Sequence, residues 1–341
     1  MTTLDKRYFL LFIFLIFINC SSEKNTSINH QNYTPIISGY TMGTTYTVKY
    51  LTDIKDGEEV LKNKNVIERI LREINMQMST YIVDSEISQF NRMDNTDWMS
   101  ISDDFAFVLK SSFDYHKISN GLYDITVMPL VNLWGFGPDK FIDIPTPAEI
   151  DSVLMFLGQD LIELQDNKIR KKDARVQIDL SSIAKGYAVD KIIESLDYEN
   201  IFVEIGGEVR TKSNGKIWKI GINTPSIENM SNEIEYIAPI KNASIATSGN
   251  YRNFYIDKEN RFYHHEINPL TGYPIMSKLA SISVLAETSC MEADGLSTAL
   301  YMMEAEDIKN FFKETDFEGL MIFIEPDMSF KKILSDNFPK N

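Results

Sequence analysis

The chain has 341 residues, 43% of them hydrophobic and 11% aromatic, which is the composition of a globular protein with a substantial core. Its formal net charge of −15 argues against nucleic acid as a partner, because nucleic-acid binding requires a basic surface. The same acidic field opposes any polyanionic ligand, so local features and a cation would have to hold one.

The N-terminus has the pattern of an exported lipoprotein. Lys6 and Arg7 precede an apolar run over residues 8–18, which ends just before Cys20. A basic start, a short apolar stretch and a polar break are typical of a secretory signal, whereas a membrane-spanning helix needs about 20 apolar residues. We predict a signal peptide over residues 1–19 and lipid attachment at Cys20. The alternative is an ordinary cleaved signal with an incidental cysteine.

The predicted mature chain begins with a tether. Residues 20–36 are mostly polar and lack periodicity, so we expect them to link the lipid to a folded domain over residues 37–338. Cys290 is the only other cysteine, and lipid on Cys20 would leave it without a disulfide partner. These features predict a protein anchored to a bacterial membrane and facing the periplasm.

Helical patterns dominate the first part of the domain. Residues 39–50 have the β-branched and aromatic content of a strand, interrupted by Gly43. Residues 60–78 and 103–118 have apolar side chains at helical spacing. Residues 122–145 are rich in Gly, Pro and aromatics and show no period. An irregular segment of this length inside a domain is more typical of a functional loop than of a linker.

Strand patterns dominate from Leu161 onward, after a short helix that the sequence Thr146-Pro147-Ala148-Glu149 predicts by its capping-box spacing. Asn214-Gly215 predicts a hairpin between strands at 208–212 and 216–223, and residues 258–260 predict a second turn. Further helices are expected at 182–196 and 290–303, and the last strands at 319–324 and 329–333. The fold class is α+β: mixed sheets with flanking helices in one compact unit, with or without an N-terminal helical subdomain.

A first candidate site lies at residues 178–188. A strand is expected to end at Leu180, Ser181 and Ser182 can cap the following helix, and Lys185 lies in its first turn. Unpaired N–H groups and the positive dipole end of a helix suit a phosphate, and the lysine adds a charge. The alternative is a plain capped helix with a solvated lysine.

A second candidate site is the pair Asp294 and Thr298. The two residues are four apart, so on a helix their oxygens face the same way. A carboxylate and a hydroxyl one turn apart can share a hard cation and leave positions for water and substrate phosphates, which is how proteins usually hold Mg²⁺. The alternative is a solvated aspartate beside a threonine bonded to the backbone.

A third candidate segment combines the small, polar residues 245–252 with the adjacent His264 and His265. The other two histidines, His30 and His116, are remote in the sequence, so we do not expect a structural zinc site. Either His264 or His265 can serve as a general base near neutral pH, or a histidine here can be satisfied within a strand.

Aromatic and methionine side chains near tight turns at residues 79–87 and 121–138 could flank a planar ring, although such density also suits a core. The patterns alone therefore predict an exported α+β protein with one Mg²⁺–phosphate site.

Seven stretches, taken together and in order, resemble the ApbE family of FAD:protein FMN transferases. They lie between about residues 39 and 303 and are MGTTYTVKY, STYIVDSEIS, GLYDITVMPLVNLWGFGP, IDLSSIAKGYAVDKI, FVEIGGEVR, ATSGNYRN and MEADGLSTAL. The resemblance implies an ApbE-like fold, related to the T-fold.

The resemblance also implies roles for individual residues. Asp294 and Thr298 match the side-chain ligands of Mg²⁺, with the backbone carbonyl of Ala184 as a third ligand. His265 matches the histidine that activates the acceptor hydroxyl. The positions matching the FAD site are Met42, Tyr81, Leu122, Tyr123, Asp124, Asp179, Lys185 and His265. The family's usual H-I-I-D-P-R-T-G is H-E-I-N-P-L-T-G here, so Asn268 and Leu270 depart from it.

The implied activity is Mg²⁺-dependent transfer of FMN from FAD, through a phosphoester bond, to a Thr or Ser hydroxyl of an acceptor protein, with release of AMP. The implied acceptors are flavin-carrying subunits of membrane redox complexes with a motif such as D-x-x-[ST]-G-[AS]-[ST]. Two alternatives are a Mg²⁺-dependent FAD pyrophosphatase that gives FMN and AMP, and an FAD-binding lipoprotein without turnover.

Overall fold

The computed structural model describes residues 33–138, 144–225, 233–251 and 253–340. The predicted signal peptide, Cys20 and most of the predicted tether lie outside these residues, so those predictions stay untested. No helix in the described part is long and apolar enough to cross a membrane.

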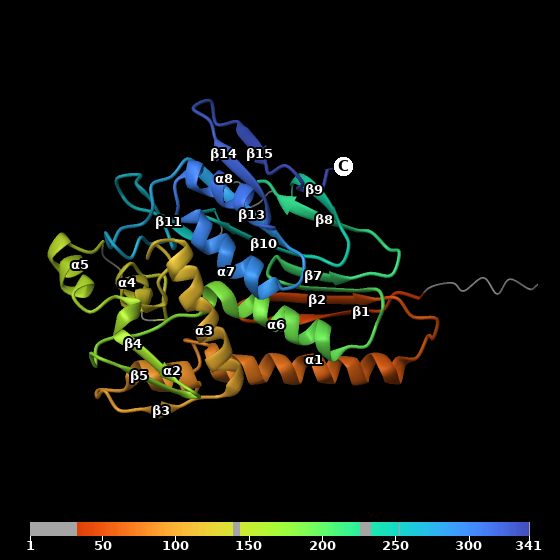
Figure 1. Cartoon of the computed structure of the whole chain (residues 1–341), viewed down its shortest axis with the longest axis horizontal. Helices are drawn as coiled ribbons and strands as arrows, with labels where there is room; N and C mark the ends of the chain where they lie inside the picture. Colours follow the sequence, from red (N-terminus) through yellow and green to blue (C-terminus); the bar gives the residue numbers. More distant parts are fainter. Residues whose placement is uncertain (1–32, 139–143, 226–232, 252, 341) are drawn as a thin grey trace, which may run out of the picture. The chain divides into compact units, whose positions relative to one another are not determined.

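Eight described strands form a continuous antiparallel sheet (Figure 1). In spatial order they are β1 (Ile36–Thr41), β2 (Thr44–Tyr50), β6 (Ile201–Ile205), β7 (Glu208–Lys212), β10 (Ser244–Gly249), β13 (Leu279–Ala286), β14 (Glu318–Ile324) and β15 (Phe330–Leu334). Smaller sheets are formed by β8 (Trp218–Asn223) with β9 (Ile234–Ile240), by β11 (Phe254–Ile256) with β12 (Phe262–His264), and by β3 (Met99–Ser100), β5 (Lys168–Lys171) and β4 (Ile162–Gln165).

Tight turns at positive φ build the first hairpins of the large sheet. Met42 (φ 48°) and Gly43 (φ 72°) connect β1 to β2, so the single interrupted strand predicted over residues 39–50 is a hairpin. Gly206 (φ 62°) and Gly207 (φ 107°) connect β6 to β7 in the same way. Two successive residues at positive φ give the twist that two-residue hairpin loops require.

The hairpin predicted at Asn214-Gly215 is wrong. β7 pairs with β6 and β10, whereas β8 pairs with β9 in a separate sheet. Long-range bonds override the local turn signal: the N–H of Thr211 donates to the carbonyl of Ala243, and the N–H of Asn214 donates to the side chain of Asn200. The second predicted hairpin, β11–β12, is confirmed.

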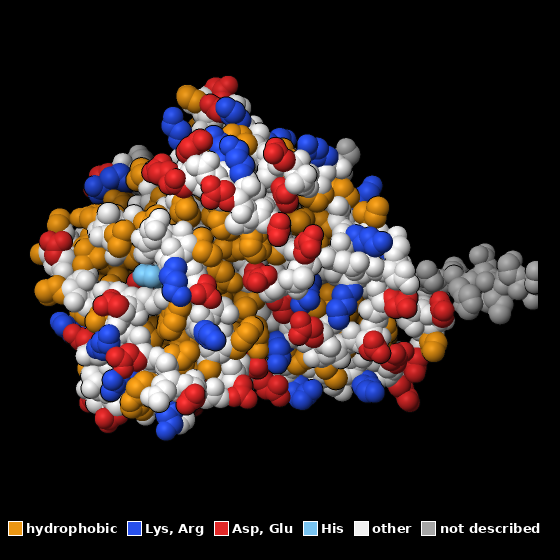
Figure 2. Space-filling model, viewed as in Figure 1, with side chains coloured by type: hydrophobic (Ala, Val, Ile, Leu, Met, Phe, Trp, Pro, Cys, Tyr) orange, Lys and Arg blue, Asp and Glu red, His pale blue; other side chains and the backbone are white. Residues whose placement is uncertain are grey.

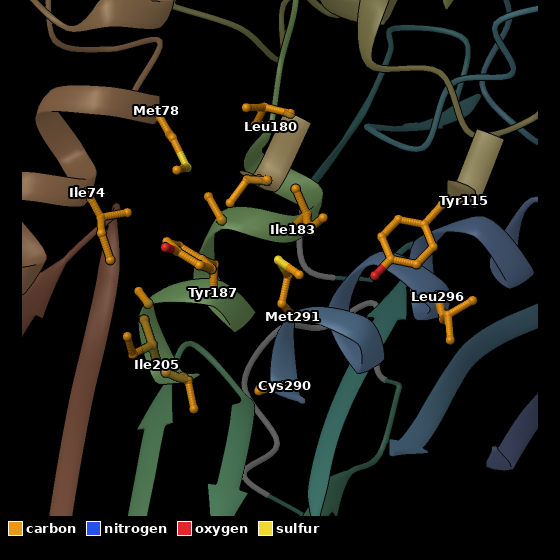
Figure 3. Close-up of a cluster of buried hydrophobic side chains, with 14 of the residues drawn as sticks. Ile74, Met78, Tyr115, Leu180, Ile183, Tyr187, Ile205, Cys290, Met291 and Leu296 are labelled. Carbon is orange, nitrogen blue, oxygen red and sulfur yellow. The ribbon is translucent and has the colours of Figure 1, made fainter. Parts of the chain in front are cut away.

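Helices cover one face of the large sheet (Figure 1). They are α1 (Gly57–Met78), α6 (Ser181–Ser195), α7 (Cys290–Tyr301) and α8 (Ala305–Glu314). Figure 3 shows side chains of this core, among them Ile74 of α1, Tyr187 of α6 and Met291 of α7, which are all buried. The sheet β8–β9 packs on the opposite face through Trp218, Ile220 and other apolar side chains.

Most helix predictions are confirmed. α3 spans Asp103–Ile118 as predicted, with the side chain of Ser102 as its N-cap, and α5 (Pro147–Leu154) has the capping box expected from Thr146 and Glu149. The segment predicted to be irregular, residues 122–145, contains a 3₁₀ turn at Ile125–Val127 and α4 (Met128–Leu133). The remaining described helix, α2, spans Glu86–Arg92, and a second 3₁₀ turn spans Gln159–Leu161.

The packing of α6 against α7 determines where the candidate site residues lie. Gly186 permits this close approach, because a Cβ atom there would come within 2.4 Å of the Cys290 carbonyl oxygen. The carboxylate of Asp190 on α6 accepts hydrogen bonds from the N–H groups of Cys290 (2.9 Å) and Met291 (3.0 Å) and from the Ser289 hydroxyl (2.8 Å). A carboxylate in this position stabilises the N-terminus of α7.

Residues of α1, α3, α6 and α7 share one hydrophobic core with β2 and β6, and residues 32–341 form one compact unit. The helical N-terminal part is therefore not a separate subdomain, and the predicted α+β fold is confirmed. On the face shown in Figure 2, Lys and Arg side chains are interspersed with Asp and Glu.

Candidate functional site

A cavity of about 320 Å³ brings together residues that lie far apart in the sequence, from Thr80 to Met302. Nine of the predicted site residues line it: Tyr81, Leu122, Tyr123, Asp124, Asp179, Lys185, His265, Asp294 and Thr298. Met42 is not among its described lining residues; it lies in the β1–β2 turn and packs against the main core. Ala184 is buried in α6, and the resemblance concerns only its backbone carbonyl.

The start of α6 differs from the prediction. No strand ends at Leu180, because the preceding strand, β5, ends at Lys171; the N-cap of α6 is Leu180, and no serine caps it. Instead the Asp179 carboxylate accepts hydrogen bonds from the backbone N–H (2.8 Å) and hydroxyl (3.0 Å) of Ser181. Burial raises the pKa of Asp179, while the bonds from Ser181 and the proximity of His265 oppose the shift. A carboxylate thus competes with any phosphate for this helix terminus.

Lys185 lies between two buried carboxylates. Its Nζ is 2.8 Å from Oε1 of Glu208 and 3.8 Å from Oδ1 of Asp294, while Oδ2 of Asp294 accepts the N–H of Gly186 at 2.8 Å. Burial raises the pKa of Asp294 to about 7; the charge of Lys185 opposes the shift and that of Glu208 adds to it. Oε2 of Glu208 is buried and no hydrogen bond from a described residue reaches it. The site therefore favours an additional positive charge.

Hydroxyl groups adjoin this acidic cluster. Thr298 Oγ1 lies 3.1 Å from the Ser248 hydroxyl, which lies 2.9 Å from that of Ser297. Among the described residues, no group of three or more His, Cys, Asp and Glu side chains could hold a metal ion. A cation here must therefore use hydroxyl, carbonyl, water or substrate oxygens besides Asp294. That donor set fits Mg²⁺, which keeps much of its coordination for water and phosphate.

The two adjacent histidines have different environments. His264 is buried, with Nε2 2.6 Å from the carbonyl oxygen of Ile275 and Nδ1 accepting the N–H of Glu266 at 3.3 Å. Burial lowers the pKa of His264, so it stays neutral and bonded to the backbone. His265 lines the cavity, and its side chain is 34% exposed. Of the pair, His265 is thus the one placed to act as a base on a bound substrate.

Asp124 has a largely structural environment. Oδ1 accepts the N–H (2.8 Å) and hydroxyl (2.6 Å) of Thr126, and Oδ2 accepts the N–H of Gln159 (3.0 Å) and lies 3.7 Å from Nδ1 of His116. These contacts hold the segment that carries Leu122 and Tyr123 against the cavity. Asp124 therefore positions the wall, although it also lines the cavity.

Aromatic side chains lie near His265. The hydroxyl of Tyr81 donates to the carbonyl oxygen of Phe136 (3.3 Å), and the ring of Phe136 lies 5.4 Å from that of Tyr255 and 6.4 Å from that of His265. Tyr81 itself is 68% exposed. Such rings can flank a planar ligand.

The sequence patterns did not single out Glu208, Ser248 or Glu266, which all line the cavity, although Ser248 lies in the candidate segment 245–252. Glu208 follows the Gly206-Gly207 turn, where the sequence shows only a strand start. Ser248 is one of several small polar residues, and Glu266 adjoins the histidine pair. Of the three, only Glu266 had a local sequence signal, because its carboxylate is adjacent to a candidate base.

Comparisons with known proteins identify the family of this chain. The ApbE family model matches residues 42–321. The chain is 42% identical to the FAD:protein FMN transferase of Haemophilus influenzae, over 89% of this chain and 90% of the relative, and 39% identical to that of Vibrio cholerae, over 89% and 91%. The solved structure of the flavin transferase ApbE from Vibrio cholerae superposes with a TM-score of 0.79 at 37% identity, over 90% of this chain and 98% of that one. The chain belongs to the ApbE family.

Proposed function

We propose that this protein transfers FMN from FAD to a Ser or Thr hydroxyl of an acceptor protein, forming a phosphoester bond and releasing AMP. The observation that carries the proposal is one cavity lined by Lys185, Asp294, Thr298 and His265. The names of the relatives support the same activity. By the resemblance, the acceptors are flavin-carrying subunits of membrane redox complexes.

Mg²⁺ is the proposed metal. The Asp294 carboxylate, the Thr298 hydroxyl and the Ala184 carbonyl would hold it. The burial of Asp294 beside Glu208 and the raised pKa of Asp294 support this assignment. When bound, a divalent cation supplies charge neutralisation for a diphosphate and for the phosphate that leaves.

The protein's own residues perform the remaining tasks. Lys185 adds a positive charge beside the diphosphate, and Tyr81 and Phe136 flank the planar ring. His265 takes the proton of the acceptor hydroxyl, whose oxygen attacks the FMN-side phosphorus of FAD. A new O–P bond forms and the bridging P–O bond breaks, with its electron pair leaving on AMP.

The test combines two measurements on the mature protein. It is incubated with FAD, Mg²⁺ and an acceptor domain that carries the motif, and covalent flavin fluorescence after denaturing electrophoresis is compared with released AMP. We expect equal amounts of covalent flavin and AMP. AMP without covalent flavin would indicate a pyrophosphatase. The absence of both products would indicate a flavin carrier. Either outcome overturns the proposal.

Two aspartate variants test the metal assignment in the same assay. Asp294→Ala should abolish Mg²⁺-dependent transfer, whereas Asp327→Ala, at an exposed turn between β14 and β15, should retain the parent rate. Transfer by Asp294→Ala at the parent rate would remove Asp294 from the mechanism.

We also propose that the protein is exported and held by lipid on Cys20, facing the periplasm. The support is the sequence pattern of residues 1–20 alone. In cells given labelled palmitate, Cys20→Ala should lose the label and leave the membrane fraction. Retention of the label in that variant would place the lipid elsewhere.

A further inference from the structure

The carboxyl group of Glu266 lies beside the proposed base. Oε1 of Glu266 is 3.5 Å from Nε2 of His265, and the Glu266 side chain is only 8% exposed. Both residues line the cavity. Nothing in the proposed chemistry so far uses this carboxyl group.

The contact at Nδ1 of His265 determines which ring nitrogen carries the basic lone pair. Nδ1 lies 3.2 Å from the carbonyl oxygen of Asn253, which also accepts the backbone N–H of His265. A carbonyl oxygen can only accept, so Nδ1 carries the hydrogen in the neutral ring. The lone pair is then on Nε2, the atom that faces Glu266.

Charged and titratable groups from several elements face the pair. Lys185 on α6, Tyr301 on α7 and the adjacent His264 interact with Glu266, while Asp179 interacts with His265. Burial raises the pKa of Glu266 to about 7, and the proximity of His264 and Lys185 opposes the shift. Glu266 can thus exchange a proton in the pH range where imidazole also titrates.

We propose that Glu266 is the positioning residue of the base: as the carboxylate it faces Nε2 of His265 and stabilises the imidazolium formed during transfer. The inference rests on the proposed function. The acceptor hydroxyl gives its proton to Nε2 as the O–P bond forms and AMP leaves. That proton passes to Oε1 of Glu266 and then to solvent, so each turnover returns the pair to its starting state.

Titration of the His265 ring by ¹⁵N NMR tests the pair without requiring turnover. Its signal is assigned by its loss in His265→Asn. Removal of the neighbouring anion in Glu266→Gln should lower the titration midpoint of His265 by about one pH unit. Glu266→Asp retains the charge and should recover part of this shift. Glu163→Gln is the matched control, because Glu163 pairs with Arg170 on β5 and does not line the cavity.

Kinetics give the second readout. Glu266→Gln should reduce kcat at least tenfold, leave KM for FAD within twofold, and move the acidic limb of the kcat/KM profile to lower pH by the same interval as the NMR midpoint. An unchanged His265 titration midpoint in Glu266→Gln would refute the proposed role of Glu266. A shifted midpoint in a protein that never transfers flavin would support the pair and refute the proposed function.

Discussion

Replacing Asp294 by Asn should stabilise the metal-free protein at alkaline pH. The residue is 3% exposed, and burial raises the pKa of its side chain from 3.8 to about 7. Asn has nearly the same shape and can still accept the N–H of Gly186. The variant therefore removes a desolvated charge and preserves most of the packing between α6 and α7.

The pKa values give the size and the sign of the effect. Because the folded pKa is raised above 3.8, the protonated carboxyl favours folding; this contribution is complete below pH 3.8 and is lost as the pH rises through about 7. At about 1.4 kcal/mol for each pH unit, the interval corresponds to about 4 kcal/mol. The free energy of unfolding of metal-free Asp294→Asn should exceed that of the parent by up to this amount at pH 8 and equal it near pH 4.

Urea unfolding with and without Mg²⁺ measures both parts of the prediction. At 100 times its Kd, Mg²⁺ should stabilise the parent by about 3 kcal/mol and leave the variant unchanged. Asp327→Asn is the control: hydrogen bonds from Ser329 lower the pKa of this exposed group, so its loss should give no gain at pH 8. A metal-free Asp294→Asn protein that is less stable than the parent at pH 8 would refute the reasoning.

Two further substitutions test the contact between α6 and α7. Gly186→Ala places a Cβ against the Cys290 carbonyl and should cost about 1–3 kcal/mol, despite the better helix propensity of Ala. It should also weaken Mg²⁺-induced stabilisation, as measured by thermal unfolding; an unchanged Mg²⁺ response would show that Asp294 is positioned independently of this contact. Asp190→Ala leaves Arg210 without its buried partner and the N-terminus of α7 without its cap, so it should cost about 3–5 kcal/mol in urea unfolding. A cost below 1 kcal/mol would contradict this assignment.

Local signals predicted the helices better than the sheets. α3 matches its prediction because Ser102 caps it and its apolar face follows the helical period. Asn214-Gly215 misled because strand pairing depends on partners far along the chain, and β7 pairs with β10 more than 30 residues later. At α6 the helix was predicted correctly, but its predicted serine cap was not. The Asp179 carboxylate accepts the backbone N–H of Ser181 instead.

The site was predictable where its residues share one helix. Asp294 and Thr298 are four apart on α7 and both line the cavity. Glu208 was not predictable from local pattern, because it reaches Lys185 only through the packing of β7 against α6. The difference between His264 and His265 likewise depends on Ile275 and Asn253, which are contacts that neighbouring sequence does not encode.

The charges of the cavity indicate how an acidic protein can accept a diphosphate. Its described lining includes five carboxyl side chains and Lys185: the acidic residues are Asp124, Asp179, Glu208, Glu266 and Asp294. Without a cation, raised pKa values let Asp294 and Glu266 hold protons in place of a metal. A diphosphate adds further negative charge, so FAD and Mg²⁺ should bind cooperatively, and binding of the cation should release the proton of Asp294. Since a proton and a metal compete for the same carboxylate, the apparent affinity for Mg²⁺ should rise with pH up to about 7 and then level off.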